Sequence, residues 1–457
     1  MKKAASLLAE WTLSEVEIPE AIKSISTDHF FDGLGNALGA LREKVPTHEY
    51  VKAMSGSVGE SFLLGTDLLT SAPNAALSLG ALIHHLDFDD THAGGLIHAT
   101  AVSLPAAISV GSAVNQTWAE VKTAGIFGLE IACRIALGSP HGFHARGLHA
   151  THISGTISSA VVTGVLHKVS PATLTNGIGI AASASGGLLE FLNTGSSTKQ
   201  LHPGMASLNG VLSLDLARFG ATGPESALEG KYGIYQTHSN RAFDINAVIS
   251  ELGSRWEAGQ ITIKPYPACQ LSHACLDAVA VVAGEIRNRL SQADEIKEIL
   301  LTVHPDSADI VAIPESEKWS PRTPYDAKFS LQWSIAALII DGGIGVETYS
   351  PESILRPEVS ALAQKVSMKL LPKTGVAADA PGHAVVHFLS GQVIEGQVQC
   401  SAGGPRLRLS KEALLGKFAI NSGAGINEVE NFYQILHSDD ISLSQLAREF
   451  KSLMRGK

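Results

Sequence analysis

Histidines are concentrated in one part of this sequence. The 457-residue chain has 18 histidines, and ten of them fall between His84 and His202. Imidazole is the side chain whose ordinary pKa lies nearest neutral pH, so it is well suited to taking up and releasing protons there. The predicted chemistry is therefore general acid–base catalysis, and the segments that carry these histidines are where a functional site is expected.

The first such segment is 81–103, ALIHHLDFDDTHAGGLIHATAVS, which holds three carboxylates and four histidines. We interpret it as a helix end, a Gly94–Gly95 turn and a second helix that begins at His98. Asp87 and Thr91 are four residues apart, so a helix would present both on one face. A hydrogen-bonded aspartate there would orient a histidine or a lysine and tune its basicity.

Two other interpretations of this segment stay open. One is a solvated helix terminus whose polar residues have no joint role. The other is a metal site, because His and Asp are ligands that suit Zn²⁺ or a di-metal centre. No familiar metal-binding spacing such as HExxH occurs in the segment, and we assign no metal ligand.

The second segment is 141–155, HGFHARGLHATHISG. Arg146 could hold a carboxylate through two hydrogen bonds, and the start of a helix just beyond it favours anions. His149 lies on the same approach and could donate or accept a proton. The alternative is that these histidines only cap a helix or fill the core.

The third segment is 193–210, NTGSSTKQLHPGMASLNG. We expect Lys199 at a loop tip beside His202, which suits anion binding or proton transfer, although an ordinary surface loop is the alternative. A fourth segment, KPYPACQLSHACLDA, begins at Lys264, at the boundary between the predicted helical part and the predicted α/β part of the chain. Clefts between domains commonly bind ligands. We favour a structural role for Cys269 over a nucleophilic pair with His273.

Charge supports a pocket for a small anion. Between His141 and His202 the only acidic residue is Glu190, although the whole chain has a net charge of -10. That net charge argues against nucleic acid or an anionic membrane surface as a partner. An acid-poor, histidine-rich stretch in an acidic chain instead predicts binding of a small polyanion.

Cysteine use and hydropathy indicate a reduced, cytoplasmic protein. The four cysteines form no CxxC pair, and the N-terminal residues read as an amphipathic helix rather than a signal peptide. Uncharged stretches such as 99–114 are rich in Ala, Gly and Ser, which is typical of close-packed buried helices and not of membrane spans.

The periodicity of apolar residues predicts a mainly α protein with two domains. A large all-helical domain is expected from residues 1–264 together with 404–457, and a smaller α/β lid domain from the inserted residues 265–403. Helices are predicted over 77–86, 121–137, 154–166, 207–219, 274–290, 411–418, 427–436 and 443–454, the last group with Ser410 and Ser442 as N-caps. Strands are predicted over 298–303, 364–370, 384–388 and 392–399.

Taken together, the segments resemble the MmgE/PrpD family, which includes 2-methylcitrate dehydratase, cis-aconitate decarboxylase and iminodisuccinate epimerase. The resemblance covers nearly the whole chain. It rests on the stretches DFDDTH, IHATA, RGLHATHISG, TKQLHPGMA, EGKYGIY, KPYPAC, HACLDA and AKFSLQW, in this order.

The resemblance implies an active site between a helical domain and a lid, a homodimer, and a reaction without a cofactor. It implies that Asp87, Thr91, His98, His149, Lys199, His202 and Lys264 line the site. In that picture the lysines and His202 hold substrate carboxylates, while His98 or His149 transfers the proton. Which histidine is the acid and which the base stays open.

Two residues depart from the family pattern. Cys269 stands where cis-aconitate decarboxylases have a histidine after the linker lysine, and Trp333 stands where many members have a tyrosine. We therefore expect a cofactor-independent lyase that dehydrates a 2-methylcitrate-like hydroxy acid. A decarboxylase or an epimerase of a related polycarboxylate is the alternative enzyme, and a polycarboxylate-binding protein without turnover is the non-enzymatic alternative.

Overall fold

The computed structural model describes residues 2–292, 295–372 and 375–454, and it is mainly α-helical, as the sequence predicts. The chain divides into two compact units. The helical unit contains the residues up to 191, residues 198–263 and those from 410 onwards. The α/β unit contains residues 192–197 and 264–409.

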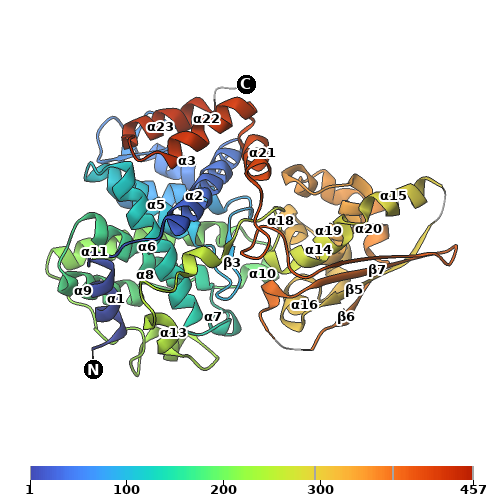
Figure 1. Ribbon diagram of the computed structural model, residues 1–457, viewed down its shortest axis with the longest axis horizontal. Helices are drawn as coiled ribbons and strands as arrows, with labels where there is room; N and C mark the ends of the chain where they lie inside the picture. Colours follow the sequence, from blue (N-terminus) through green and yellow to red (C-terminus); the bar gives the residue numbers. More distant parts are fainter. Residues whose placement is uncertain (1, 293–294, 373–374, 455–457) are drawn as a thin grey trace. The chain divides into compact units, whose positions relative to one another are not determined.

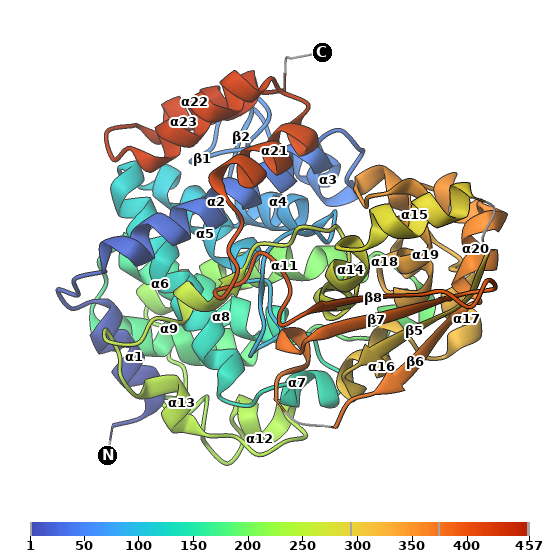
Figure 2. The same ribbon diagram turned by 45° about the vertical axis from the view of Figure 1, so that its right-hand side comes forward.

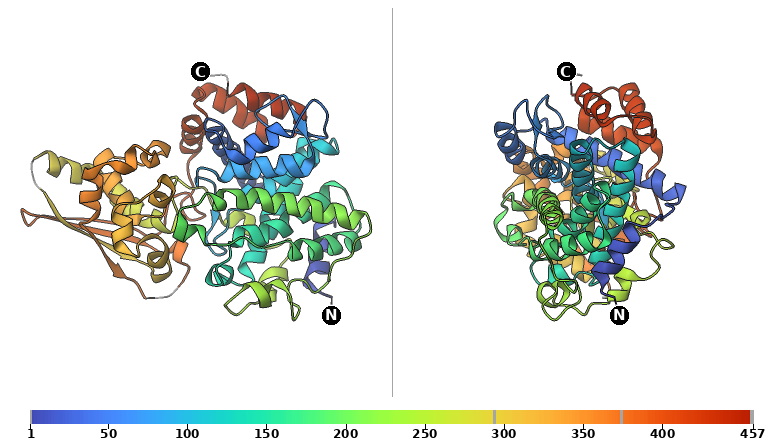
Figure 3. Two further views of the ribbon diagram at one scale, coloured as in Figure 1. Left: turned by 180° about the vertical axis from the view of Figure 1, so that it is seen from behind. Right: turned by 90° about the vertical axis from the view of Figure 1, so that its left-hand side faces the viewer.

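Five long helices form the centre of the helical unit. They are α4 (Ala72–His84), α5 (Thr100–Ala113), α6 (Trp118–Leu137), α8 (Ala150–Leu166) and α11 (Thr198–Arg218). Helix α11 packs against α4, α5 and α8, and it crosses the unit as a long green helix in the left view of Figure 3. A Cβ atom on Gly204 would lie 2.2 Å from the carbonyl oxygen of Leu77, so only glycine allows α11 to approach α4 this closely.

Shorter elements surround this centre. The helices are α1 (Ala4–Thr12), α2 (Glu20–Ala40), α3 (Pro46–Ala53), α7 (Gly142–Ala145), α9 (Pro171–Ser183), α12 (Ile234–His238) and α13 (Ile245–Ile249). Helix α10 (Phe191–Thr194) begins at the last residue of this segment and otherwise belongs to the α/β unit. The unit is not all-helical, because β1 (Ser61–Phe62) pairs with β2 (Leu69–Thr70) and β3 (Thr91–His92) pairs with β4 (Ile261–Thr262). Three of these four segments contain a β-branched residue (Thr70, Thr91, Ile261 and Thr262), which favours extended backbone.

The last three helices complete the helical unit. They are α21 (Lys411–Ser422), α22 (Ile426–His437) and α23 (Leu443–Ser452), and Figure 1 shows them in red beside the blue helix α2. Phe418 stacks on Phe31 of α2 with 4.2 Å between ring centroids. The hydroxyls of Ser410 and Ser442 accept the backbone N–H three residues later, which confirms both as N-caps.

The α/β unit is built on one four-stranded sheet, seen in Figure 2, in the order β6 (Val366–Leu370), β5 (Ile296–Val303), β7 (Gly382–Phe388), β8 (Val393–Val398). Strands β5 and β6 are parallel and the other pairs antiparallel. Every other side chain of β7 is buried, because one face of the strand meets helix α14 and the rest of the core.

The remaining helices of this unit are α14 (His273–Ala280), α15 (Ala283–Ser291), α16 (Pro305–Val311), α17 (Glu315–Trp319), α18 (Pro324–Lys328), α19 (Leu331–Asp341) and α20 (Pro357–Ala363). The single helix predicted over 274–290 is wrong, since the chain leaves the helix at Val281 and Val282. Two adjacent β-branched valines lower helix propensity there. Within the described residues, no helix has both the length and the apolar character needed to cross a bilayer.

Candidate active site

The loop that follows α4 carries three carboxylates, each with a different partner. Helix α4 ends at His84, and Asp87 has a left-handed backbone with φ of 53°. Thr91 then lies in strand β3. The prediction that Asp87 and Thr91 share one face of a helix is therefore wrong, because the chain turns sharply between them. Aspartate is among the few residues that adopt a left-handed conformation at modest cost.

Asp89 and Asp90 hold the neighbouring segments in place. The carboxylate of Asp89 accepts a hydrogen bond from Nδ1 of His84 at 2.8 Å. The carboxylate of Asp90 accepts from the backbone N–H of Thr100 at 3.1 Å and from its hydroxyl at 2.5 Å. Asp90 therefore binds the first residue of α5, while Asp89 orients a buried imidazole.

Asp87 forms a buried ion pair with Lys199. The Nζ atom of Lys199 donates to Oδ1 of Asp87 at 2.6 Å, and both side chains are almost fully buried. Lys199 is the second residue of α11, so the prediction of a lysine at a loop tip is wrong. The helix starts earlier than its apolar pattern indicates, and α11 packs against α4, with Gly204 close to Leu77.

His98 lies next to the Asp89–His84 pair. Its Nδ1 is 2.9 Å from the carbonyl oxygen of Asp90, 3.4 Å from Oγ1 of Thr91 and 3.6 Å from Oδ2 of Asp89. Its ring centroid is 4.4 Å from that of His84. His98 precedes α5 by two residues instead of beginning it, and the structure thus brings Thr91 and His98 together as predicted.

His149 and His202 form a second histidine pair. His149 is the N-cap of α8, His202 lies in α11, and their Nδ1 atoms are 3.0 Å apart. One Nδ1 must carry the proton and the other must accept it, so two neutral rings here have opposite tautomers. The ring centroid of His149 is 6.2 Å from that of His98, which joins the two groups into one buried cluster.

Burial keeps several of these imidazoles neutral. It lowers the pKa of His149 well below its usual value, and the nearby His202 and Lys199 add to the effect. Burial lowers the pKa of His202 and of His152 to about 4, and that of His144 to about 3. A neutral imidazole has one nitrogen that can accept a proton, so these rings are in the base form at neutral pH, although the lowered pKa makes each a weaker base than a free histidine.

Three helix N-termini meet at the cluster. His98 lies just before α5, His149 caps α8, and Lys199 is in the first turn of α11, while these three helices pack on one another. A helix N-terminus carries partial positive charge and favours anions. The arrangement can therefore hold carboxylates beside groups that transfer protons.

One predicted binding residue, Arg146, lies away from this cluster, and a second, Lys264, belongs to the other unit. Arg146 is exposed, and its guanidinium donates to Oδ1 of Asn240 at 3.1 Å, so the structure does not support a direct role in the cluster. The reason is that α7 (Gly142–Ala145) ends in a turn that directs the next residues towards solvent. Lys264 is buried at the start of the second segment of the α/β unit, and its role in the site stays a prediction.

Three residues with a role in the geometry are missing from the sequence prediction. His84 and Asp89 form the hydrogen-bonded pair described above, and the only signal was their spacing at the end of a helix. Lys417, in α21, donates to the carbonyl oxygen of Phe88 at 2.8 Å and pairs with Asp32 at 2.7 Å. No local pattern could show that a lysine 329 positions away supports this loop.

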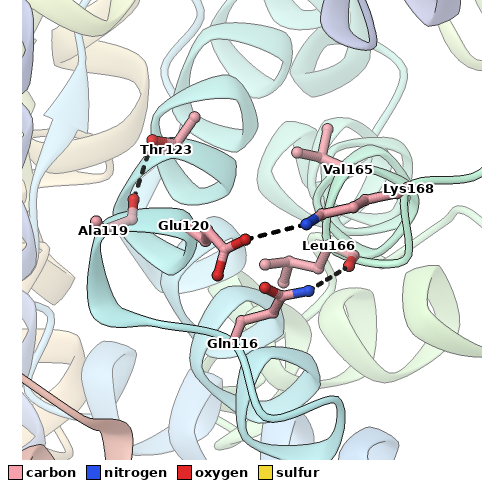
Figure 4. Close-up of a pocket in the computed structure, with 7 residues that line it drawn as sticks. All are labelled: Gln116, Ala119, Glu120, Thr123, Val165, Leu166 and Lys168. Atoms are coloured by element: carbon pink, nitrogen blue, oxygen red, sulfur yellow. Dashed lines mark hydrogen bonds and ion pairs between the residues drawn. The ribbon is translucent and has the colours of Figure 1, made fainter.

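The surface hollow in Figure 4 is a different feature. It has a volume of about 240 Å³ and is lined by residues of α6, the end of α8 and the segments beside them. An ion pair of 3.1 Å between Glu120 and Lys168 bridges it. Its lining contains none of the cluster residues, so we do not assign it to the same site.

Comparison with known proteins gives two matches to family domains and several relatives. Residues 5–246 match the MmgE/PrpD N-terminal domain, and residues 266–439 match the MmgE/PrpD C-terminal domain. The chain is 25% identical to a cis-aconitate decarboxylase of Aspergillus terreus, over 93% of this chain and 90% of that protein. It is also 25% identical to the human cis-aconitate decarboxylase, over 71% of this chain and 67% of that protein.

Proposed function

The chain belongs to the MmgE/PrpD family, and from this premise we propose that it is a lyase acting on a small di- or tricarboxylate. In this proposal the chain's own side chains transfer the protons, without a cofactor. The observation that carries it is the meeting of three helix N-termini and Lys199 with a group of buried histidines. Each charge-assisted hydrogen bond to a substrate carboxylate would contribute about 1.5–3 kcal/mol.

The first candidate reaction is dehydration of a 2-methylcitrate-like hydroxy acid. Dehydration needs a base that removes a proton beside a carboxylate and an acid that protonates the departing hydroxyl. The cluster offers two separate imidazole groups for these tasks, His84–His98 with Asp89 and His149–His202. Lys199 would hold a carboxylate of the substrate while Asp87 keeps its ammonium in place.

Decarboxylation is the second candidate, because the relatives named above are cis-aconitate decarboxylases. Two residues, Trp333 and Cys269, weigh against decarboxylation. Trp333 is fully buried in the core of the α/β unit, and its ring centroid lies 5.8 Å from that of Tyr349. Trp333 is thus a packing residue, which weakens its value as evidence on the substrate. Cys269 is only partly buried and keeps its weight. Epimerisation stays the third candidate.

One experiment separates these reactions. The purified protein is incubated with a panel of small polycarboxylates in heavy water, and the products are followed by mass spectrometry and NMR. Loss of water identifies dehydration, and loss of carbon dioxide identifies decarboxylation. Retention of every heavy atom, with one deuterium incorporated and the configuration inverted, identifies epimerisation. Binding without any conversion would show instead a polycarboxylate-binding protein.

The site assignment has its own test. His149→Asn should abolish turnover while the variant keeps the wild-type circular dichroism spectrum. His85→Asn is the matched control, because His85 bonds to Glu43 at 2.9 Å and lies outside the cluster. Undiminished activity of the His149 variant would contradict the assignment.

We also propose that the protein is a homodimer. Helix α11 exposes an apolar stripe made of Met205, Leu212 and Leu216, and the stripe continues to Phe219, which is 90% exposed. Their spacing of seven, four and three residues places them on one side of the helix. Covering this stripe with a second copy would remove apolar surface from water, which supports the proposal.

A further inference from the structure

His84, His98 and His149 each direct a ring nitrogen towards the others. The three side chains are buried, and one potential ligand atom from each lies within 4.8 Å of the others. Zinc–imidazole bonds are 2.0–2.1 Å long, so tetrahedral ligation separates the nitrogens by about 3.4 Å. Each ring would have to move by less than about 1 Å to reach that geometry.

The other ring nitrogen of each histidine already has a partner that would orient it. Nδ1 of His84 is bonded to the carboxylate of Asp89, and Nδ1 of His98 is 2.9 Å from the carbonyl oxygen of Asp90. Nδ1 of His149 is 3.0 Å from His202. Metal-binding histidines nearly always have such a partner on the second nitrogen, which fixes the ring and raises its basicity. An ion would therefore be bound by the three Nε2 atoms.

Carboxylates close to the three histidines supply negative charge. Asp87 and Asp89, together with His84 and His98, form a second set of possible ligand atoms within 4.8 Å of one another. Asp87 is paired with Lys199, whereas Asp89 is hydrogen-bonded to His84 and would place its negative charge beside a bound cation. Three imidazoles with nearby carboxylates suit Zn²⁺ and similar transition-metal ions better than Mg²⁺ or Ca²⁺, which prefer oxygen ligands.

We propose that His84, His98 and His149 bind one Zn²⁺ ion per chain and that this ion inhibits the enzyme. Zinc on the Nε2 atoms would occupy the lone pairs that accept protons during the reaction. The inhibitory part rests on the proposed function, whereas the binding part rests on geometry alone. Zinc would then act as a reversible blocker of the acid–base groups.

Binding is tested without reference to activity. Full-length protein without a histidine tag is dialysed against a chelator and titrated with Zn²⁺ by calorimetry and with Co²⁺ by visible absorption. We expect one ion per chain and the intense absorption of four-coordinate Co²⁺. His84→Asn should abolish stoichiometric binding, and His85→Asn, the neighbouring control, should leave it unchanged.

A second variant keeps the test decisive if His84→Asn does not fold. Asp89→Asn replaces the charged partner of His84, which also lies 3.6 Å from Nδ1 of His98, by a neutral amide, and weakening of such a partner typically lowers metal affinity 10–100-fold. Absence of stoichiometric binding by the wild type, or equal affinity in the wild type and the folded His84 or Asp89 variant, would overturn the site.

Activity then tests the inhibitory role. Chelator-treated enzyme should keep full turnover on the substrate found in the panel, and one equivalent of Zn²⁺ should stop it reversibly. Turnover that is lost on chelation and restored by Zn²⁺ would show a cofactor and overturn inhibition. Zinc binding in a protein that converts no polycarboxylate would sustain the site and contradict only the proposed function.

Discussion

The Nζ atom of Lys199 lies 2.6 Å from Oδ1 of Asp87, although 112 residues separate them in the sequence. Both side chains are buried at the centre of the histidine cluster. A buried ion pair is costly to break by removing one partner, because the other charge is then left in a medium of low polarity. The pair therefore couples the stability of the loop after α4, which carries Asp87, to the ammonium group of Lys199, which we expect to hold substrate.

Lys199→Met should abolish turnover and lower the free energy of unfolding by about 3–5 kcal/mol. The double variant Asp87→Asn/Lys199→Met should recover most of that stability, because no charge is left unbalanced, but should stay inactive. Denaturant unfolding and turnover assays measure the two effects. A double variant as unstable as the single one would show that the pair does not act as a unit.

Lys417→Met should destabilise the loop that carries Asp87. It removes the hydrogen bond to the carbonyl oxygen of Phe88 and leaves Asp32 without its cation. Burial raises the pKa of Asp32 and the ammonium of Lys417 opposes this, so the variant should drive Asp32 towards its neutral form. Because protonation relieves part of the cost, we expect a loss of about 2–3 kcal/mol.

The matched control for Lys417 is Lys411→Met in the same helix, whose partner Glu430 is on the surface. It should change stability by less than about 1 kcal/mol. Turnover should fall in the Lys417 variant alone, as measured under conditions where both proteins are folded. Equal turnover in both would show that Lys417 does not position the loop.

Stability should fall as the pH drops from about 6.5 to about 4. The pKa values of His152 and His202 are lowered by burial to about 4 in the folded state, so the unfolded chain binds more protons in this window. Each such histidine contributes about 1.4 kcal/mol per pH unit to the slope. The contribution is fully present above pH 6.5 and is lost by pH 4.

His152→Asn removes one of these titrating groups. The slope of unfolding free energy against pH should become shallower by about 1.4 kcal/mol per pH unit between pH 6 and 4.5. Above pH 7.5 the two proteins should have parallel curves, which is the internal control. The same slope in the variant and the wild type would mean that His152 is not buried in its neutral form.

Leu212→Asp should convert a dimer into a monomer. A charge at the middle of the α11 stripe would be buried without a partner in the proposed interface, which is strongly unfavourable. Leu355→Asp is the control, because Leu355 is 77% exposed and lies in the α/β unit. Sedimentation velocity reports the state of each, and a wild-type monomer at assay concentrations would refute the proposal.

Periodicity was a good guide to individual elements. The strands predicted over 298–303 and 384–388 lie within β5 and β7, because alternate burial leaves a two-residue repeat. Errors fell where tertiary contacts oppose local preference. Lys199 is buried in an ion pair with Asp87, which lies in another element. The residues around Lys199 in the sequence therefore give no sign of this partner.

The sequence by itself determined which side chains are available for chemistry. Ten histidines, one acid between His141 and His202, and the family motifs all follow from residue types and order. Only the tertiary structure decided which of them meet. It brought His84, His98, His149 and His202 into one cluster, because the N-termini of three helices converge there. It also placed Arg146 outside that cluster. Contacts between residues far apart in sequence depend on helix packing, which residue order encodes only through the whole fold.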